Sequence, residues 1–71
     1  MKELFYVPSD ADGRRCEEAF RSRVRISISG CDAVSNQIRP YTGYVISVEY
    51  ISGASTGRQW KVGIETDEIA N

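Results

Sequence analysis

The stretch RSRVRISIS, residues 21–29, carries a positive charge at every second position of its first half. On a β-strand, Arg21, Arg23 and Arg25 would project from one side at intervals of about 6.6–6.8 Å. This interval is close to the spacing of successive phosphates on an extended single strand of nucleic acid. The arginines are therefore candidate contacts for phosphate or another acidic ligand. The alternative, which we favour, is a solvated strand face whose charges are neutralised by neighbouring glutamates.

A second candidate binding position follows a proline. Tyr41 comes directly after Pro40, in a segment that we expect to form an exposed turn, and Arg39 lies beside it. An exposed aromatic ring next to a cation can stack on a base or pack in a protein interface. Arg39 and Tyr41 therefore join the three arginines as candidate binding residues. The aromatic residues that alternate with aliphatic ones are expected in the core instead: Tyr44, Tyr50 and Trp60.

The sequence contains no histidine, which restricts the chemistry that the chain can carry. A Ser-His or Cys-His nucleophile is impossible, and zinc loses its commonest nitrogen ligand. Carboxylates could still act as an acid and base pair, but those available stand where turns and helix caps need them. These are Asp10, Asp12, Glu17, Glu18 and Asp32. We therefore predict a non-enzymatic protein that uses no metal ion and no cofactor.

Composition limits the class of protein further. The 71 residues form one domain at most, and nine basic and ten acidic side chains leave a formal charge of −1. This balance lacks the bulk attraction expected of a dedicated nucleic-acid binder. Because the sequence contains no long apolar run, we expect a cytoplasmic protein without contact to membranes. In that compartment Cys16 and Cys31 are expected to be free thiols, although the sequence also permits their pairing.

Short apolar alternations broken by turn residues indicate a small β domain. We expect strands over residues 3–7, 22–29, 44–51 and 59–65, and a turn and short last strand over 66–69. Cys16, Ala19 and Phe20 fall at positions i, i+3 and i+4, which predicts a short helix near 14–20. Asp12 is the candidate N-cap of that helix. Residues 30–36 are expected to form a loop.

The predicted strand over 44–51 is apolar on both sides. The face that its alternation assigns to the core carries Tyr44, Ile46, Val48 and Tyr50. The opposite face carries Val45 and Ile51, which are too apolar to leave in water. These two residues are therefore candidates for self-association. A small core in so short a chain favours the same conclusion.

The predicted strands over 44–51 and 59–65 are expected to pair antiparallel. Pairs whose residue numbers have an even sum keep both apolar faces on the same side. The register that also forms a charge pair places Glu49 opposite Lys61 and Tyr50 opposite Trp60.

The order of a long early loop, a hairpin and a terminal turn resembles the SH3-like small β-barrel superfamily. Within it, IRPY, VEYI and RQWKV are similar to the end of the WYL domain, a ligand-sensing barrel of bacterial regulators. The family's R-x-aromatic-basic-aliphatic strand and the aromatic residue before it would correspond to Tyr50, Arg58, Trp60, Lys61 and Val62. Its aromatic-Tyr-Leu core is absent.

A second resemblance is to the plasmid-borne type II dihydrofolate reductases, which are tetrameric barrels. The resemblance lies in the order of three stretches of this sequence: RVRISISG, YTGYVISVEY and the DEIAN ending. Because their Val-Gln-Ile-Tyr pore motif has no match in this sequence, reductase activity is not expected.

Residues 1–71 are thus predicted to form one small, all-β, SH3-like barrel of four to five antiparallel strands. We expect a binding module that self-associates and binds a protein or a small ligand. The alternative is a nucleic-acid-binding barrel that uses the arginines and Tyr41. A more remote alternative is an enzyme that works through carboxylates at an oligomer interface.

Overall fold

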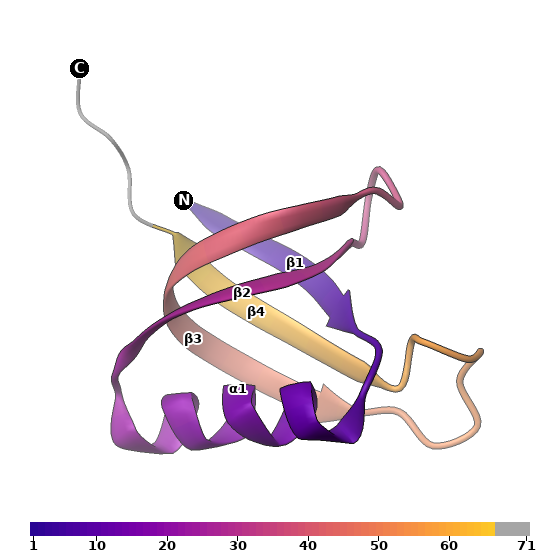
Figure 1. Cartoon of the computed structure of the whole chain (residues 1–71), viewed down its shortest axis with the longest axis horizontal. Coiled ribbons are helices and arrows are strands. Elements are labelled where there is room, and N and C mark those ends of the chain that lie inside the picture. The colour runs from indigo at the N-terminus through magenta and orange to yellow at the C-terminus, as the bar shows by residue number, and fades with distance from the viewer. Residues whose placement is uncertain (67–71) are drawn as a thin grey trace.

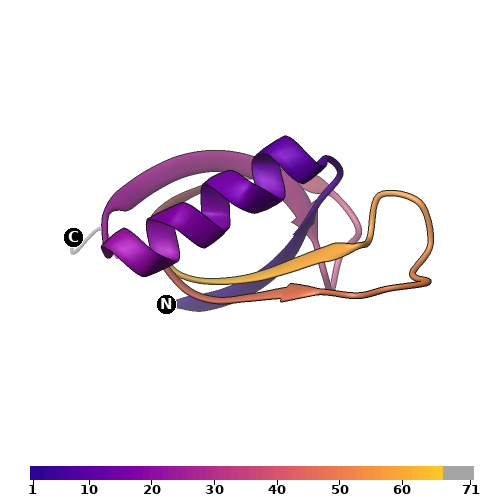
Figure 2. The same ribbon diagram turned by 90° about the horizontal axis from the view of Figure 1, so that it is seen from below.

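A computed structural model describes residues 1–66 of the chain. It contains four strands and one helix, which are β1 (Lys2–Val7), α1 (Asp10–Ser22), β2 (Arg25–Asp32), β3 (Ile38–Tyr50) and β4 (Trp60–Thr66). The strands pair antiparallel in a closed barrel, and α1 lies along one side of it (Figures 1 and 2). The prediction of a small all-β barrel with one helix is confirmed. The short last strand expected over 66–69 falls outside the described residues, apart from Thr66, which ends β4.

Helix α1 is longer than the helix predicted near 14–20. Its N-cap is Ser9 and not Asp12: the Asp12 N–H donates to Ser9 Oγ at 3.2 Å. The helix ends at Arg23, which adopts the left-handed conformation with φ 55°. The segment PSDADG, residues 8–13, is rich in residues that favour turns, but it contains the start of α1. Here Ser9 caps the helix, and Asp10 and Asp12 lie in its first turn, where negative charge is favourable.

Gly13 allows α1 to contact the barrel closely. A Cβ atom at this position would overlap the indole ring of Trp60. The same ring donates a hydrogen bond from Nε1 to Asp10 Oδ1 at 2.9 Å, and it meets Tyr50 edge-on with 5.1 Å between ring centroids. Trp60 was predicted to lie in the core; it is half-buried and packs against the core from the helix side.

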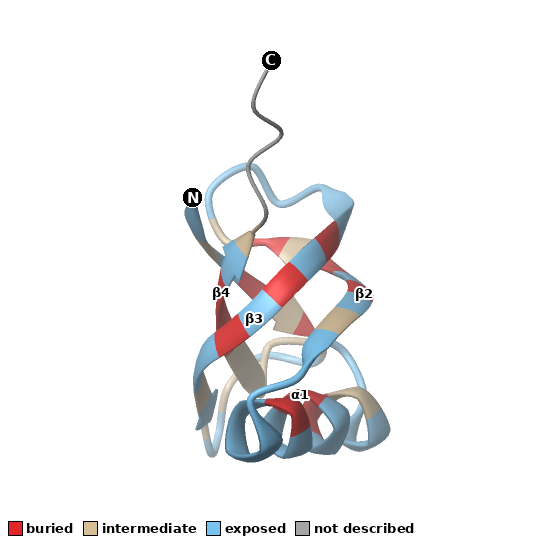
Figure 3. Ribbon diagram, turned by 90° about the vertical axis from the view of Figure 1, so that its left-hand side faces the viewer, coloured by how far each residue is buried: buried red, intermediate tan, exposed pale blue. Residues whose placement is uncertain are grey.

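The core inside the barrel consists of Phe5, Val7, Cys16, Ala19, Ile28, Tyr41, Val45, Val62 and Ile64. Buried and exposed residues alternate along β3 in Figure 3, as expected for a strand with one face toward the core. Residues 30–32, predicted to belong to a loop, extend β2 instead.

Strand β3 pairs with β2 along its first half and with β4 along its second half. Gly43 is opposite Ile26 of β2 and also opposite Thr66 of β4. A Cβ atom at Gly43 would overlap the main-chain carbonyl oxygen of Glu65. The point at which β3 changes from β2 to β4 therefore requires a residue without a side chain.

The register of β3 on β4 matches the prediction in one half only. Glu49 is opposite Lys61 and Tyr50 is opposite Trp60, which confirms the predicted pairs. Between Val45 and Ser47 the register shifts, so that one extra residue lies in β3.

This bulge exchanges the two faces of β3. Val45 points into the core, whereas Tyr44 and Ile46 are exposed, and Tyr50 is exposed at the end of the strand. The bulge therefore overturns the predicted core face at Tyr44 and Ile46. Tyr50 keeps its predicted pairing with Trp60 but is not buried, and only Val48 of that set packs against the core.

We expect Gly13→Ala to destabilise the protein, although the same change in an ordinary exposed helix stabilises it by about 1 kcal/mol. The added methyl group must displace the Trp60 ring, and such overpacking costs about 1–3 kcal/mol. Urea unfolding followed by circular dichroism measures the change. Arg21→Ala on the exposed side of α1 is the control and should shift stability by no more than about 0.5 kcal/mol. A more stable Gly13→Ala variant would contradict the contact.

Candidate functional site

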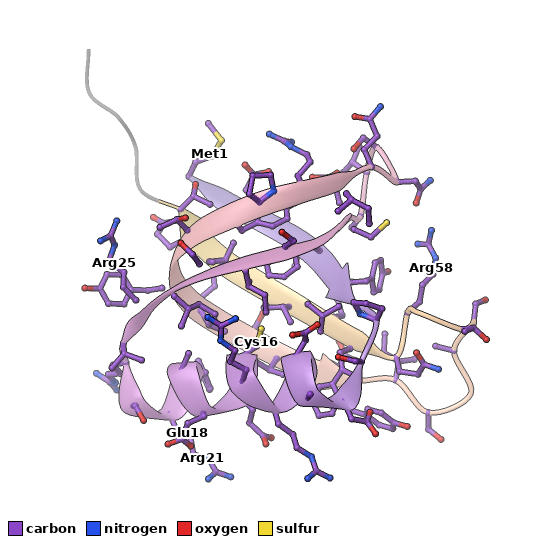
Figure 4. All side chains as sticks on the ribbon, viewed as in Figure 1. Met1, Cys16, Glu18, Arg21, Arg25 and Arg58 are labelled. Carbon is purple, nitrogen blue, oxygen red and sulfur yellow. The ribbon has the colours of Figure 1, made fainter. Side chains whose placement is uncertain are left out.

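The three arginines of the opening motif do not form a row. Arg21 belongs to α1, Arg23 is the left-handed residue that ends the helix, and only Arg25 lies in a strand. Figure 4 shows Arg21 and Arg25 on opposite sides of the polypeptide, one below the helix and one above it. The predicted spacing on a strand is therefore wrong. The helix continues to Ser22 because Cys16 and Ala19 are buried on its inner side.

Tyr41 is buried, contrary to its predicted exposure. It is 3% exposed and stacks on Phe5, with ring centroids 4.2 Å apart and planes 9° from parallel. Pro40 does not form a turn, because it lies within β3, opposite Ser29. Proline has no N–H, so these two residues form a pair without mutual hydrogen bonds and the strand continues. The next residue then faces the core.

The hydroxyl group of Tyr41 donates to Asp32 Oδ2 at 2.9 Å. Asp32 Oδ1 accepts two main-chain N–H groups, those of Val34 and Ser35, each at 2.9 Å. These hydrogen bonds lower the pKa of Asp32 from its usual 3.8 to about 2, the main-chain donors being the largest cause. Burial, followed by the bond to Asp32, raises the pKa of Tyr41 to about 12. This carboxylate therefore holds the connection between β2 and β3 in place.

Arg39 extends this network toward the surface, with Nη1 3.6 Å from Asp32 Oδ2. A hollow of about 490 Å³ at the end of the barrel brings part of the predicted binding set together. Its lining residues are Glu3, Arg25, Arg39, Pro40, Tyr41, Thr42 and Thr66. Arg21 and Arg23 are not among them. Because Glu3 brings a carboxylate into the same hollow, the surroundings of the two arginines are of mixed charge.

The two residues predicted to mediate self-association do not share an outer face. Val45 is 6% exposed and belongs to the core, which corrects its predicted orientation. Ile51 is half-buried after the end of β3, and its N–H donates to the Gln59 carbonyl oxygen at 2.6 Å. The bulge at Ile46 is the physical reason for the burial of Val45, since it reverses the alternation of β3 before Ser47.

A different apolar surface takes their place. Leu4 and Ile46 are 47% and 42% exposed and lie on either side of Gly63 on the outside of the sheet formed by β1, β4 and β3. Beside Ile46, a hollow of about 300 Å³ is lined by Phe20, Arg23, Tyr44, Val45 and Ile46. We call Leu4 and Ile46, together with Phe20 and Tyr44 from this hollow, the outer apolar face.

Charged residues border the outer apolar face in two rows across the three strands. On one side of Gly63, Glu65 of β4 lies opposite Lys2 of β1. On the other side, Lys61 of β4 lies opposite Glu49 of β3. Each row thus carries one positive and one negative side chain. The Met1 amino group is 3.6 Å from Glu65 Oε2.

Sequence reasoning missed the outer apolar face because it treated the alternation of β3 as unbroken. One signal was available: Gly63 lies within β4, at a position between the polar residues Lys61 and Glu65. A glycine within a strand often marks a bulge or a close approach of a neighbouring strand. Here the missing side chain makes room for Ser47, whose Oγ would overlap a Cβ atom at Gly63.

The two cysteines form no disulfide within the described chain. Cys16 and Cys31 are free, and Cys16 is buried. Burial, followed by the negative charge of Asp12, raises the pKa of Cys16 to about 11, so its nucleophilic thiolate form is scarce at neutral pH. Within residues 1–66, no group of three or more Cys, Asp or Glu side chains is arranged to hold a metal ion.

Comparison of the chain with protein-family models, with curated proteins and with solved structures gives no match. Membership of the SH3-like superfamily stays a prediction. Within the described residues, no helix has both the length and the apolar character needed to cross a membrane.

Acid sensitivity provides a test of the Asp32 network. Because the folded-state pKa of Asp32 is depressed to about 2, its stabilisation is complete above the unfolded-state pKa near 3.8 and is lost as the pH falls from there toward 2. Tyr41→Phe removes one of the hydrogen bonds that lower this pKa. We therefore expect a smaller loss of stability between about pH 5 and about pH 2.5 in this variant than in the native chain.

Urea unfolding at the two pH values measures this difference. Tyr44→Phe, which removes an exposed hydroxyl group, is the control and should keep the native pH dependence. An unchanged pH dependence in Tyr41→Phe would mean that the phenol does not affect the ionisation of Asp32.

Proposed function

We propose that this chain is a non-enzymatic protein-binding module whose binding surface is the outer apolar face. One observation carries the proposal: Leu4 and Ile46 lie on either side of Gly63, Phe20 and Tyr44 line the hollow beside Ile46, and all four are about half exposed. Apolar groups gathered on one face, with a polar rim, are typical of protein interaction sites. Tyr44 adds an aromatic ring, a group enriched in such interfaces.

The character of the rim favours a protein partner over a nucleic acid. Lys2, Glu65, Lys61 and Glu49 carry both signs of charge, whereas a nucleic-acid site needs an excess of positive charge along the backbone. The nucleic-acid alternative also depended on a row of three arginines on one strand. Arg21 and Arg23 lie outside the strands, which leaves that alternative with less support.

The enzyme alternative has weak support because two of the carboxylates that it could use have structural partners. Asp32 is fully engaged by two main-chain N–H groups and the Tyr41 hydroxyl group. Asp10 accepts a hydrogen bond from Trp60, and Cys16 is buried with a raised pKa. Asp10 and Asp32 therefore have structural partners, and they are poor candidates for an acid and base pair.

Site-specific photo-crosslinking tests the proposal directly. A benzophenone amino acid replaces Tyr44 in the outer apolar face or Val34, which is 91% exposed after β2. Irradiation is carried out in lysate of the native host, and adducts are identified by mass spectrometry. We expect discrete protein adducts from position 44 and none from position 34.

The control position has a similar chemical environment for the probe, because both side chains are apolar and solvent-exposed. Equal labelling from the two positions would indicate contact by random collision. Equal labelling, or the absence of protein adducts at position 44, would refute the outer apolar face as a binding surface.

A further inference from the structure

We propose that the partner of the outer apolar face is a second copy of this chain, bound face to face about a two-fold axis that passes over Gly63 and runs across the strands. This inference rests on the proposed function, because it names the occupant of the same surface. It differs from the self-association predicted through Val45 and Ile51, since Val45 lies in the core.

The strand register makes this geometry specific. Three rows of paired residues run across β1, β4 and β3. The first row consists of Lys2, Glu65 and Tyr44, and the second of Leu4, Gly63 and Ser47. The bulged Ile46 lies between Tyr44 and Ser47. Tyr6, Lys61 and Glu49 form the third row. The proposed axis follows the middle row, so it places the first row of one copy over the third row of the other. Each strand faces its own copy in the opposite direction.

This operation brings opposite charges together twice. Glu65 of one copy faces Lys61 of the second copy, and the symmetry repeats the contact at the other end of the interface. Tyr44, which is 47% exposed, faces Glu49 of the second copy. The charged rim of one copy is therefore complementary to the rim of a second copy. A partner whose surface carries charges of one sign only would not match this rim.

The apolar centre fits the same arrangement. Leu4 and Ile46 project on either side of Gly63, and Ser47 Oγ occupies the space that a side chain at Gly63 would take. Two such faces can approach to about 10 Å, the ordinary separation of packed sheets, and cover each other's Leu4 and Ile46. A single chain with nine buried core residues among residues 1–66 would gain apolar burial from this contact.

A second axis direction is disfavoured by the same charges. If the two-fold axis ran along the strands, Glu65 would face Glu65 of the second copy and Lys61 would face Lys61. Like charges at both ends oppose association. The charge pattern on β4 thus selects one of the two symmetric ways to stack the sheets.

Sedimentation equilibrium of the purified chain, with complementary charge reversals, tests this geometry. We expect a concentration-dependent dimer of the native chain. Lys61→Glu places a glutamate opposite Glu65 at both ends, and Glu65→Lys places a lysine opposite Lys61. Each variant alone should raise the dimer dissociation constant about tenfold or more, because two attractive contacts become repulsive.

A mixture of the two variants makes the test sharp. In the heterodimer, the glutamate introduced by Lys61→Glu in one chain faces the lysine introduced by Glu65→Lys in the other. At the opposite end of the interface, the unaltered Glu65 faces the unaltered Lys61. Mixing should therefore restore association to about the native strength. Arg21→Glu, a reversal on the exposed side of α1, is the matched control and should leave the dissociation constant unchanged.

A monomer up to about 1 mM, or variants that do not rescue each other, would overturn the inference. Circular dichroism verifies that each variant folds; if a reversal unfolds the chain, Lys61→Gln and Glu65→Gln replace the reversals and should each weaken the dimer. The photo-crosslinking experiment separates the two proposals. Adducts with a different protein from position 44, together with a monomeric purified chain, would refute the dimer and leave the binding module intact.

Discussion

The rest of this structure depends on how β3 divides its length between two neighbouring strands. β3 follows β2 through its first half and β4 through its second half, and the change occurs at Gly43. Only a residue without a side chain fits there against the main chain of Glu65. Because one long strand serves both partners, a sheet of four strands can close into a barrel. The barrel closes with only two residue pairs between β1 and β2.

The bulge at Ile46 follows from the same curvature and decides which surface the protein presents. An extra residue in one strand increases its bend and twist, which a tightly closed barrel requires. Its second effect is to exchange the faces of β3, so that Val45 fills the core and Tyr44 and Ile46 reach the surface. A feature needed for closure thereby creates the outer apolar face around Gly63.

Two polar anchors hold the elements that the barrel does not pair. Asp32 accepts hydrogen bonds from Val34, Ser35 and Tyr41, and so joins the connection after β2 to the buried part of β3. Asp10 accepts from the Trp60 indole and fixes the start of α1 against β4. The placement of these two carboxylates costs little free energy, because each accepts charge-assisted hydrogen bonds where it lies. The outer surface is then left to apolar and charged side chains whose arrangement supports a binding role.

The sequence by itself determined the class of fold and much of the local pairing. Apolar alternation predicted a small β-barrel, and the spacing of Cys16, Ala19 and Phe20 predicted a helix. The even sum of paired residue numbers, together with the opposite charges, predicted Glu49 opposite Lys61. These features depend on neighbours along the chain or on one adjacent strand. The candidate site was not accessible in this way. A bulge leaves no mark in the alternation before pairing is known, so the tertiary structure alone decided that Val45 is buried and Ile46 exposed. It also decided that Tyr41 lies inside, because proline at an unbonded position lets a strand continue where the sequence suggested a turn. Side-chain direction in a strand has a period of two, so one inserted residue reverses the faces on one side of it, here the residues before Ser47. That reversal depends on barrel closure, which involves the whole chain.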